Sequence, residues 1–120
     1  MIKELPISEK EIVAFEAQET LTEEEFQQVA ETVKSRINKY ENVRLMIVLP
    51  HFVFRKVTTI ESRISFLKDH LGYIEKLGLV GDEDQKLFDA VSKIVDMASD
   101  TDIRRFTLSE QEKAKEWIAE

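Results

Sequence analysis

The stretch Val43-Arg44-Leu45-Met46-Ile47-Val48-Leu49, followed by Pro50, decides the fold class of this chain. It is short, apolar at every position except Arg44, and ended by a proline, which cannot donate a backbone hydrogen bond. Such a run is typical of a strand that is buried on both faces, as in a parallel sheet covered by helices. We therefore expect Val43–Leu49 to be the central strand of an α/β domain.

Strand and helix patterns precede this central strand. Residues 2–5 and 12–17 form two short apolar segments separated by a polar turn, which predicts a pair of antiparallel strands. Thr22 and Glu25 then have the spacing of a capping box, which marks the start of a helix. The helix that follows has one apolar stripe at spacings of three and four residues, formed by Phe26, Val29, Ala30, Val33, Ile37 and Tyr40.

The alternation continues after the central strand. A helix with an apolar stripe from Ile60 to Leu71 is expected to end at Gly72, in the left-handed conformation that favours glycine. The remaining expected elements are a strand over 73–80, a helix capped by Asp82, a strand over 103–108, and a helix that begins at a capping box over 109–112 and lays Trp117 and Ile118 onto the core.

This order of elements predicts the fold class. Strands that alternate with helices of this size imply right-handed crossovers and a mostly parallel sheet. The antiparallel pair at the start makes the sheet mixed. We expect an α/β fold with about five strands flanked by about four helices, in a single domain over residues 1–120.

Composition narrows the range of functions. The 120 residues carry 17 Lys and Arg against 24 Asp and Glu, a net charge of −7, which argues against nucleic-acid binding. The chain has no cysteine, so disulfides and thiol catalysis are excluded. Its first residues lack the pattern of a signal peptide, and no apolar run is long enough to span a bilayer. We expect a cytoplasmic protein for which peripheral membrane contact stays open.

No motif for catalysis is present in the sequence. His51 and His70 stand apart, without a second ligand at helical spacing, so no metal site is expected. The chain has neither a nucleophile elbow nor a phosphate-binding glycine loop. We therefore expect no enzyme activity and no cofactor. His70 has a structural role to fill, because a donor in the last turn of a helix suits its exposed carbonyl groups.

The loop after the central strand is the best candidate site. Ligands of open α/β sheets lie beyond the carboxyl ends of the strands. This loop has no acidic residue, and it joins positive charge and aromatic rings to a helix start with hydroxyl groups. The candidate residues are His51, Phe52, Phe54, Arg55, Lys56, Thr58 and Thr59. The alternative is a loop in which Phe52 and Phe54 fold back over the sheet edge and Thr58 only caps the helix.

Several segments together resemble the SpoIIAA-like family, which is related to STAS domains and is also compared with CRAL-TRIO lipid-binding domains. They are Leu21-Thr22-x-x-x-Phe26, the central strand, the segment from Leu71 through Gly78-Leu79-Val80-Gly81-Asp82, and Ile103-Arg104-Arg105-Phe106 before an acidic capped helix. The resemblance covers nearly the whole chain and implies a STAS-like fold, a mixed sheet flanked by helices.

The resemblance also implies a type of function. STAS antagonists carry an Asp-Ser-Ser-Gly step after the central strand, and a partner kinase phosphorylates its serine. The matching stretch here is Arg55-Lys56-Val57-Thr58-Thr59, so Thr58 and Thr59 are the candidate phosphorylation sites. The first hypothesis is a non-enzymatic binding or regulatory module with a protein partner. The alternative is a carrier of a lipid or a small apolar anion. The oligomeric state, including a homodimer, stays open.

Overall fold

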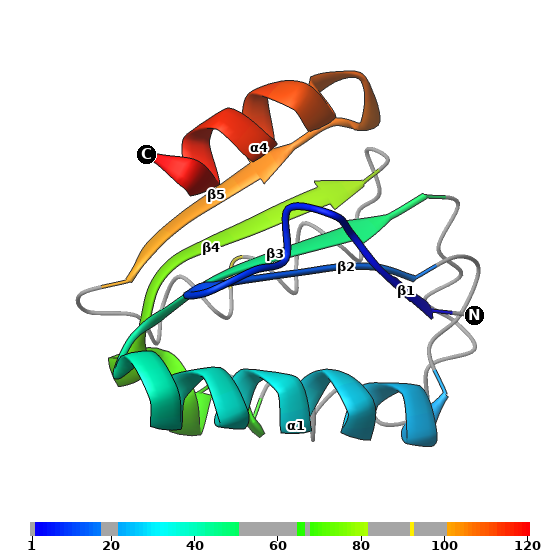
Figure 1. Cartoon of the computed structure of the whole chain (residues 1–120). Coiled ribbons are helices and arrows are strands. Elements are labelled where there is room, and N and C mark those ends of the chain that lie inside the picture. The colour runs from blue at the N-terminus through cyan, green and yellow to red at the C-terminus, as the bar shows by residue number, and fades with distance from the viewer. Residues whose placement is uncertain (1, 18–21, 51–64, 67, 82–91, 93–100) are drawn as a thin grey trace.

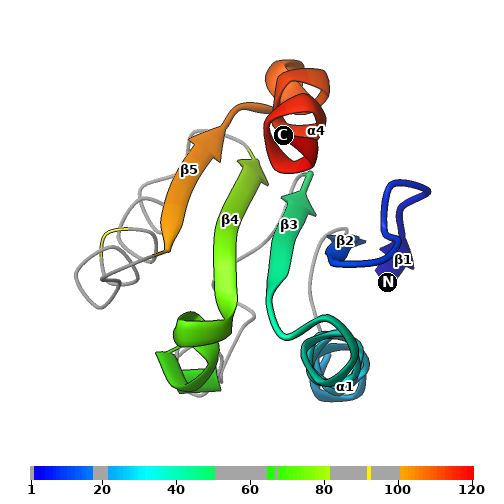
Figure 2. The ribbon, with the colours of Figure 1, turned by 60° about the vertical axis from the view of Figure 1, so that its left-hand side comes forward.

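The computed structural model describes residues 2–17, 22–50, 65–66, 68–81, 92 and 101–120. Its strands form one five-stranded sheet in which the spatial order is the sequence order. Figure 2 shows the strands side by side in this order. They are β1 (Ile2–Glu4), β2 (Ile12–Ala17), β3 (Val43–Leu49), β4 (Ile74–Gly81) and β5 (Asp102–Phe106).

The sheet is mixed, as the sequence predicts. Strand β1 pairs with β2 in the antiparallel direction, whereas β2, β3, β4 and β5 pair in parallel. The bounds of β2 and β3 are those expected from the sequence, and those of β4 and β5 differ by one or two residues at each end. The α/β fold class expected from the sequence is therefore confirmed.

Strand β3 is central and covered on both faces. Val43 and Leu45 lie in a buried cluster on one face of the sheet, and Met46 and Val48 lie in a second cluster on the other face. All four side chains are at most 2% exposed. The nearly continuous apolar sequence of β3 thus reflects burial on both faces, because a strand with one solvated face would alternate apolar and polar residues.

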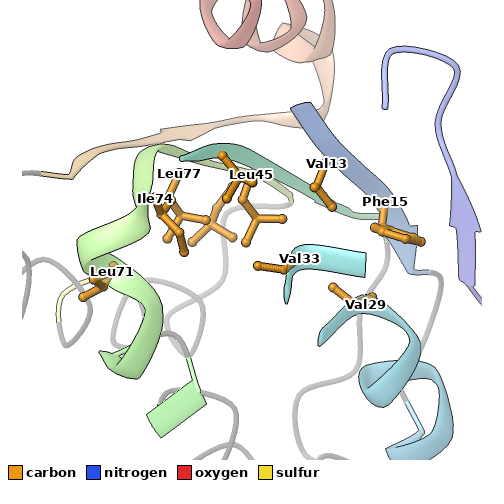
Figure 3. Close-up of a cluster of buried hydrophobic side chains, with 10 residues drawn as sticks. Val13, Phe15, Val29, Val33, Leu45, Leu71, Ile74 and Leu77 are labelled. Atoms are coloured by element: carbon orange, nitrogen blue, oxygen red, sulfur yellow. The ribbon is translucent and has the colours of Figure 1, made fainter. Parts of the chain in front are cut away.

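Helix α1 (Glu23–Tyr40) covers the first face of the sheet. The expected capping box is present: the Thr22 hydroxyl accepts a hydrogen bond from the Glu25 amide at 3.2 Å, and the Glu25 carboxylate accepts one from the Thr22 amide at 3.1 Å. Figure 3 shows Val29 and Val33 of α1 facing residues of the sheet. The buried members of this cluster are Val13, Phe15, Val29, Val33, Val43, Leu45, Leu71, Ile74, Leu77 and Leu79.

Helix α4 (Gln111–Ala119) covers the opposite face, as Figure 1 shows. Its residues Trp117 and Ile118 are buried, as expected. Two basic side chains of the sheet bind its last carbonyl groups: Lys76 Nζ lies 2.8 Å from the Trp117 oxygen, and Arg44 Nη1 lies 3.0 Å from the Ile118 oxygen. These positive charges match the negative end of the helix dipole.

The start of the last helix was wrongly predicted. The capping box is formed by Thr107 and Glu110, and a 3-10 turn, η3 (Leu108–Glu110), precedes α4. Ser109 therefore lies inside this turn, with its hydroxyl 3.0 Å from that of Thr107. Both pairs, residues 107 and 110 and residues 109 and 112, have the spacing of a capping box. The end of β5 at Phe106 decides between them, since the chain must turn immediately afterwards.

The expected role of Gly72 was also wrong. It lies within a 3-10 turn, η2 (Leu71–Tyr73), and no glycine in the described part of the chain has a positive φ. The left-handed positions are instead Lys10, with a φ of 54°, and Glu41, with a φ of 70°.

The described helical segments are fewer than the four that the sequence predicts. Besides α1 and α4, residues 65–66 and 68–70 are α-helical and form the end of the helix expected to finish near Leu71. Apart from residue 92, the helix expected after Asp82 lies outside the described residues. No described helix is long and apolar enough to cross a membrane.

Candidate functional site

The predicted loop begins where two parallel strands end side by side. Leu49, the last residue of β3, is the register partner of Gly81, the last residue of β4. Both are buried, and the half-buried Pro50 follows Leu49 at the sheet edge. The predicted site residues themselves, His51, Phe52, Phe54, Arg55, Lys56, Thr58 and Thr59, lie outside the described residues. Their role, including the choice between surface and core positions for the two rings, stays a prediction.

The chain that follows this loop returns to α1 through an aromatic contact. Phe66 packs edge to face against Phe26 of α1, with ring centroids 5.6 Å apart. The Lys34 ammonium, also on α1, lies 5.9 Å from the centroid of the Phe66 ring. The end of the helix after the candidate loop is thereby held on the α1 face of the sheet. The Phe26–Phe66 contact therefore joins the amino end of α1 to the end of the helix that follows the loop.

His70 has the structural role that the sequence predicts. Its Nδ1 atom lies 2.8 Å from the carbonyl oxygen of Phe66, one helical turn earlier. Because a carbonyl oxygen only accepts hydrogen bonds, Nδ1 carries the proton. The His70 ring also stacks on the Phe66 ring, with centroids 4.3 Å apart. His70 therefore lies at the end of its helix, where it also lines a neighbouring groove.

A groove of about 640 Å³ lies at the other end of the sheet, between the carboxyl-terminal half of α1 and the η2 turn. Figure 2 shows these two segments next to the amino ends of β3 and β4. The volume is in the range of small-molecule and peptide sites. The lining residues are Lys34, Ile37, Asn38, Glu41, Asn42, His70, Gly72 and Tyr73.

The sequence patterns did not indicate this groove, and it is the structure that marks Glu41 as an unusual residue. Glu41 ends α1 with a φ of 70° and a ψ of −46°, and a positive φ is more readily adopted by glycine than by a residue with a side chain. A glutamate held in this region carries backbone strain, and such strain is common at functional positions. Tyr73 gives a second signal, because a large ring that is 52% exposed directly precedes a buried strand.

The acidic groups with displaced pKa values belong to the helix caps. Hydrogen bonds from the backbone and side chain of Thr107 lower the pKa of the Glu110 carboxyl. Burial acts to raise the pKa of Glu25, but its hydrogen bonds, led by the one from the Thr22 backbone, outweigh burial and lower that pKa. Both pKa shifts follow from the hydrogen bonds of capping boxes, so neither shift marks a functional site. Within the described ranges, no three His, Asp or Glu side chains lie together as a metal site.

Comparison with known proteins identifies the family. A family model described as SpoIIAA-like matches residues 12–119, which is nearly the whole chain. No curated protein and no solved structure matches. The matched range includes all five strands except β1, together with α1 and α4. The chain therefore belongs to the SpoIIAA-like family.

Proposed function

We propose that the protein is a non-enzymatic binding or regulatory module of the STAS type, and that it acts through the loop over 51–59 and the helix that follows it. Membership of the SpoIIAA-like family supports a binding or regulatory role. The position of the loop supports the choice of surface, because it starts where β3 and β4 end side by side. This position is the observation that carries the proposal.

The partner is a protein that presents negative charge to the loop. Arg55 and Lys56 lie in an acid-free segment of a chain whose net charge is −7. Local positive charge on an acidic protein steers acidic surfaces toward one place. Phe52 and Phe54 would add the aromatic anchors that are common at the centre of contact surfaces.

The end of the helix after the loop supports a mechanism of signal transfer. Phe66 contacts Phe26 and lies beneath Lys34, so a shift of this helix on partner binding would be felt by α1. A phosphate on Thr58 or Thr59 would meet Arg55, Lys56 and the free amides of a helix start, and the fold would tolerate it. These two threonines are the sites we propose for such control.

Affinity capture with a charge-reversed loop tests the proposal. The wild-type protein and an Arg55→Glu/Lys56→Glu variant are used as bait in the same extract, and captured proteins are quantified by mass spectrometry. Lys113→Glu is the matched control, since Lys113 is an exposed lysine on α4, across the sheet from α1. We expect one or more partners that wild type and Lys113→Glu retain and the loop variant loses. Equal capture by all three baits would refute the loop as the binding surface.

A lipid or small apolar anion is the alternative cargo. The side chains on both faces of β3 pack directly against helices or against each other, so this part of the sheet is filled by protein atoms. The groove between α1 and η2 is lined mostly by polar side chains, so it does not favour a lipid, and the carrier function enters as a competing outcome of the experiments.

A further inference from the structure

The groove beside α1 has opposite charges at its two ends. Lys34 and Glu41 both line it, and both are exposed. They are seven positions apart along α1 and its cap, a separation of about 10 Å at the rise of an α-helix. Among the described residues, neither side chain takes part in an ion pair. The groove therefore presents one positive and one negative group that no ion pair among the described residues neutralises, although the Lys34 ammonium also lies 5.9 Å from the centroid of the Phe66 ring.

An exposed aromatic ring stands at the rim of the same groove. Tyr73 is 52% exposed, and no other large apolar side chain in the described segments is exposed to this degree. Tyr73 precedes β4, so a rigid strand fixes its backbone. A ring of this kind is a typical anchor at the centre of a protein interface. The surface thus combines a projecting ring with an adjacent hollow.

We propose that a second copy of this chain docks on the groove and forms a two-fold symmetric dimer. A two-fold rotation exchanges the two ends of the groove, so Lys34 would face the partner's Glu41 and Glu41 would face the partner's Lys34. In this proposed dimer, each Tyr73 ring would pack against the groove of the other copy. Charge complementarity argues for this occupant, because a surface with opposite charges at its ends matches its own rotated copy.

The proposed dimer leaves the proposed partner surface free. The groove lies at the amino ends of β3 and β4, whereas the loop over 51–59 begins at the carboxyl end of β3. Two copies joined through the grooves would present two such loops. A bivalent partner would then bind with increased avidity without any new contact at the loop.

Sedimentation equilibrium with charge-reversed variants tests the dimer. The set is wild type, Lys34→Glu, Glu41→Lys, the double reversal, Tyr73→Ala, and the control Lys113→Glu on α4. We expect wild type to dimerise, and each single reversal to raise the dimer Kd by about tenfold or more, as is usual for facing charges made alike. The double reversal should return the Kd to within about threefold of wild type, because the two pairs are restored with opposite signs. Tyr73→Ala should also weaken the dimer, and Lys113→Glu should not.

Folding is checked on the same samples. Trp117 is the only tryptophan and lies on the α4 face, so its fluorescence reports the fold independently of the groove. If Glu41→Lys fails to fold, Glu41→Gln removes the charge with less change and is measured instead. The proposal is overturned by a wild-type protein that stays monomeric at every concentration reached. It is equally overturned by a dimer that the single reversals leave unchanged or that the double reversal fails to restore.

Discussion

Replacing Met46 with aspartate tests whether β3 is covered on both faces. Met46 is fully buried, in the same cluster as Ala114, Trp117 and Ile118 of α4. On this face the basic side chains of Arg44 and Lys76 already donate hydrogen bonds to the last carbonyl groups of α4, so an aspartate at position 46 would not gain a free ion-pair partner. The folded protein can hold this side chain only by leaving a buried charge unpaired or by keeping the carboxyl protonated.

The expected loss of stability is calculated for the less costly alternative, in which the buried carboxyl stays protonated. Keeping a carboxyl with an ordinary pKa of about 3.9 protonated at pH 7 costs roughly 4 kcal/mol, at about 1.4 kcal/mol for each pH unit. The lost methionine packing adds about 2 kcal/mol or more. The total of about 6 kcal/mol is comparable to the whole stability of many domains.

The substitution also predicts a pH dependence. Burial raises the pKa of the new carboxyl in the folded state above its unfolded value, so the folded state binds the extra proton. Relative to wild type, the Met46→Asp variant should therefore lose stability as the pH rises. Between pH 5 and pH 7 the difference should grow by nearly 3 kcal/mol.

Urea unfolding followed by Trp117 fluorescence measures these values. Met46→Leu is the matched control and should cost less than about 1.5 kcal/mol, because volume and apolar character are kept. Lys3→Asp places the same side chain on an exposed position of β1 and should change stability by no more than about 0.5 kcal/mol. If Met46→Asp unfolds at the urea concentration of Met46→Leu at pH 7, β3 is not covered as described.

Four further substitutions test other parts of the structure. Thr22→Ala removes the hydroxyl that caps α1 and should cost about 1 kcal/mol in urea unfolding. The pKa of the Glu25 carboxyl is lower in the folded than in the unfolded state, so ionised Glu25 stabilises the fold above the unfolded pKa, and this stabilisation is lost as the pH falls through the folded pKa. Between pH 6 and pH 3, the Glu25→Gln variant should therefore lose less stability than wild type. Gly78→Val should destabilise by about 1–3 kcal/mol, since even a Cβ atom at Gly78 would lie 3.3 Å from the ring of the single tryptophan. Phe54→Ala should change the free energy of unfolding by less than about 0.5 kcal/mol, because we predict that the Phe54 ring lies on the surface. A loss of about 3–5 kcal/mol would instead place the ring in the core.

The elements that could be predicted from the sequence are those in which one strong local signal dominates. The apolar run of β3 is flanked in the sequence by two segments with the apolar stripe of a helix, so it can only be interpreted as a buried strand. The Thr22 capping box lies directly before a regular apolar stripe, so two signals agree on the start of α1. The expected interaction of His70 with a carbonyl group in its last helical turn was confirmed for the same reason.

The errors arose where local patterns were equally good or where tertiary context decides. Thr107 and Ser109 both have a glutamate three positions later, and only the end of β5 selects Thr107. Gly72 has the residue type for a left-handed helix end, yet the chain there makes a 3-10 turn, and the positive φ at a helix end is found at Glu41 instead. Glycine permits that conformation without requiring it.

The groove could not be predicted because its walls come from two distant segments. Residues 34–42 and residues 70–73 meet only when β3 and β4 pair in parallel and bring their amino ends together. Neither segment has a motif by itself. The register of the sheet, which sequence patterns do not specify to the residue, places Tyr73 and Glu41 at the same edge.

Native mass spectrometry of gently purified protein tests the proposed function most directly, because it separates a binding module from a carrier. The bare chain has a mass of 14.0 kDa. We predict ions of the chain, its dimer, or a complex with another protein, all without a small-molecule adduct. A stoichiometric adduct of lipid size that is lost on denaturation would contradict the proposed binding module and establish the protein as a carrier.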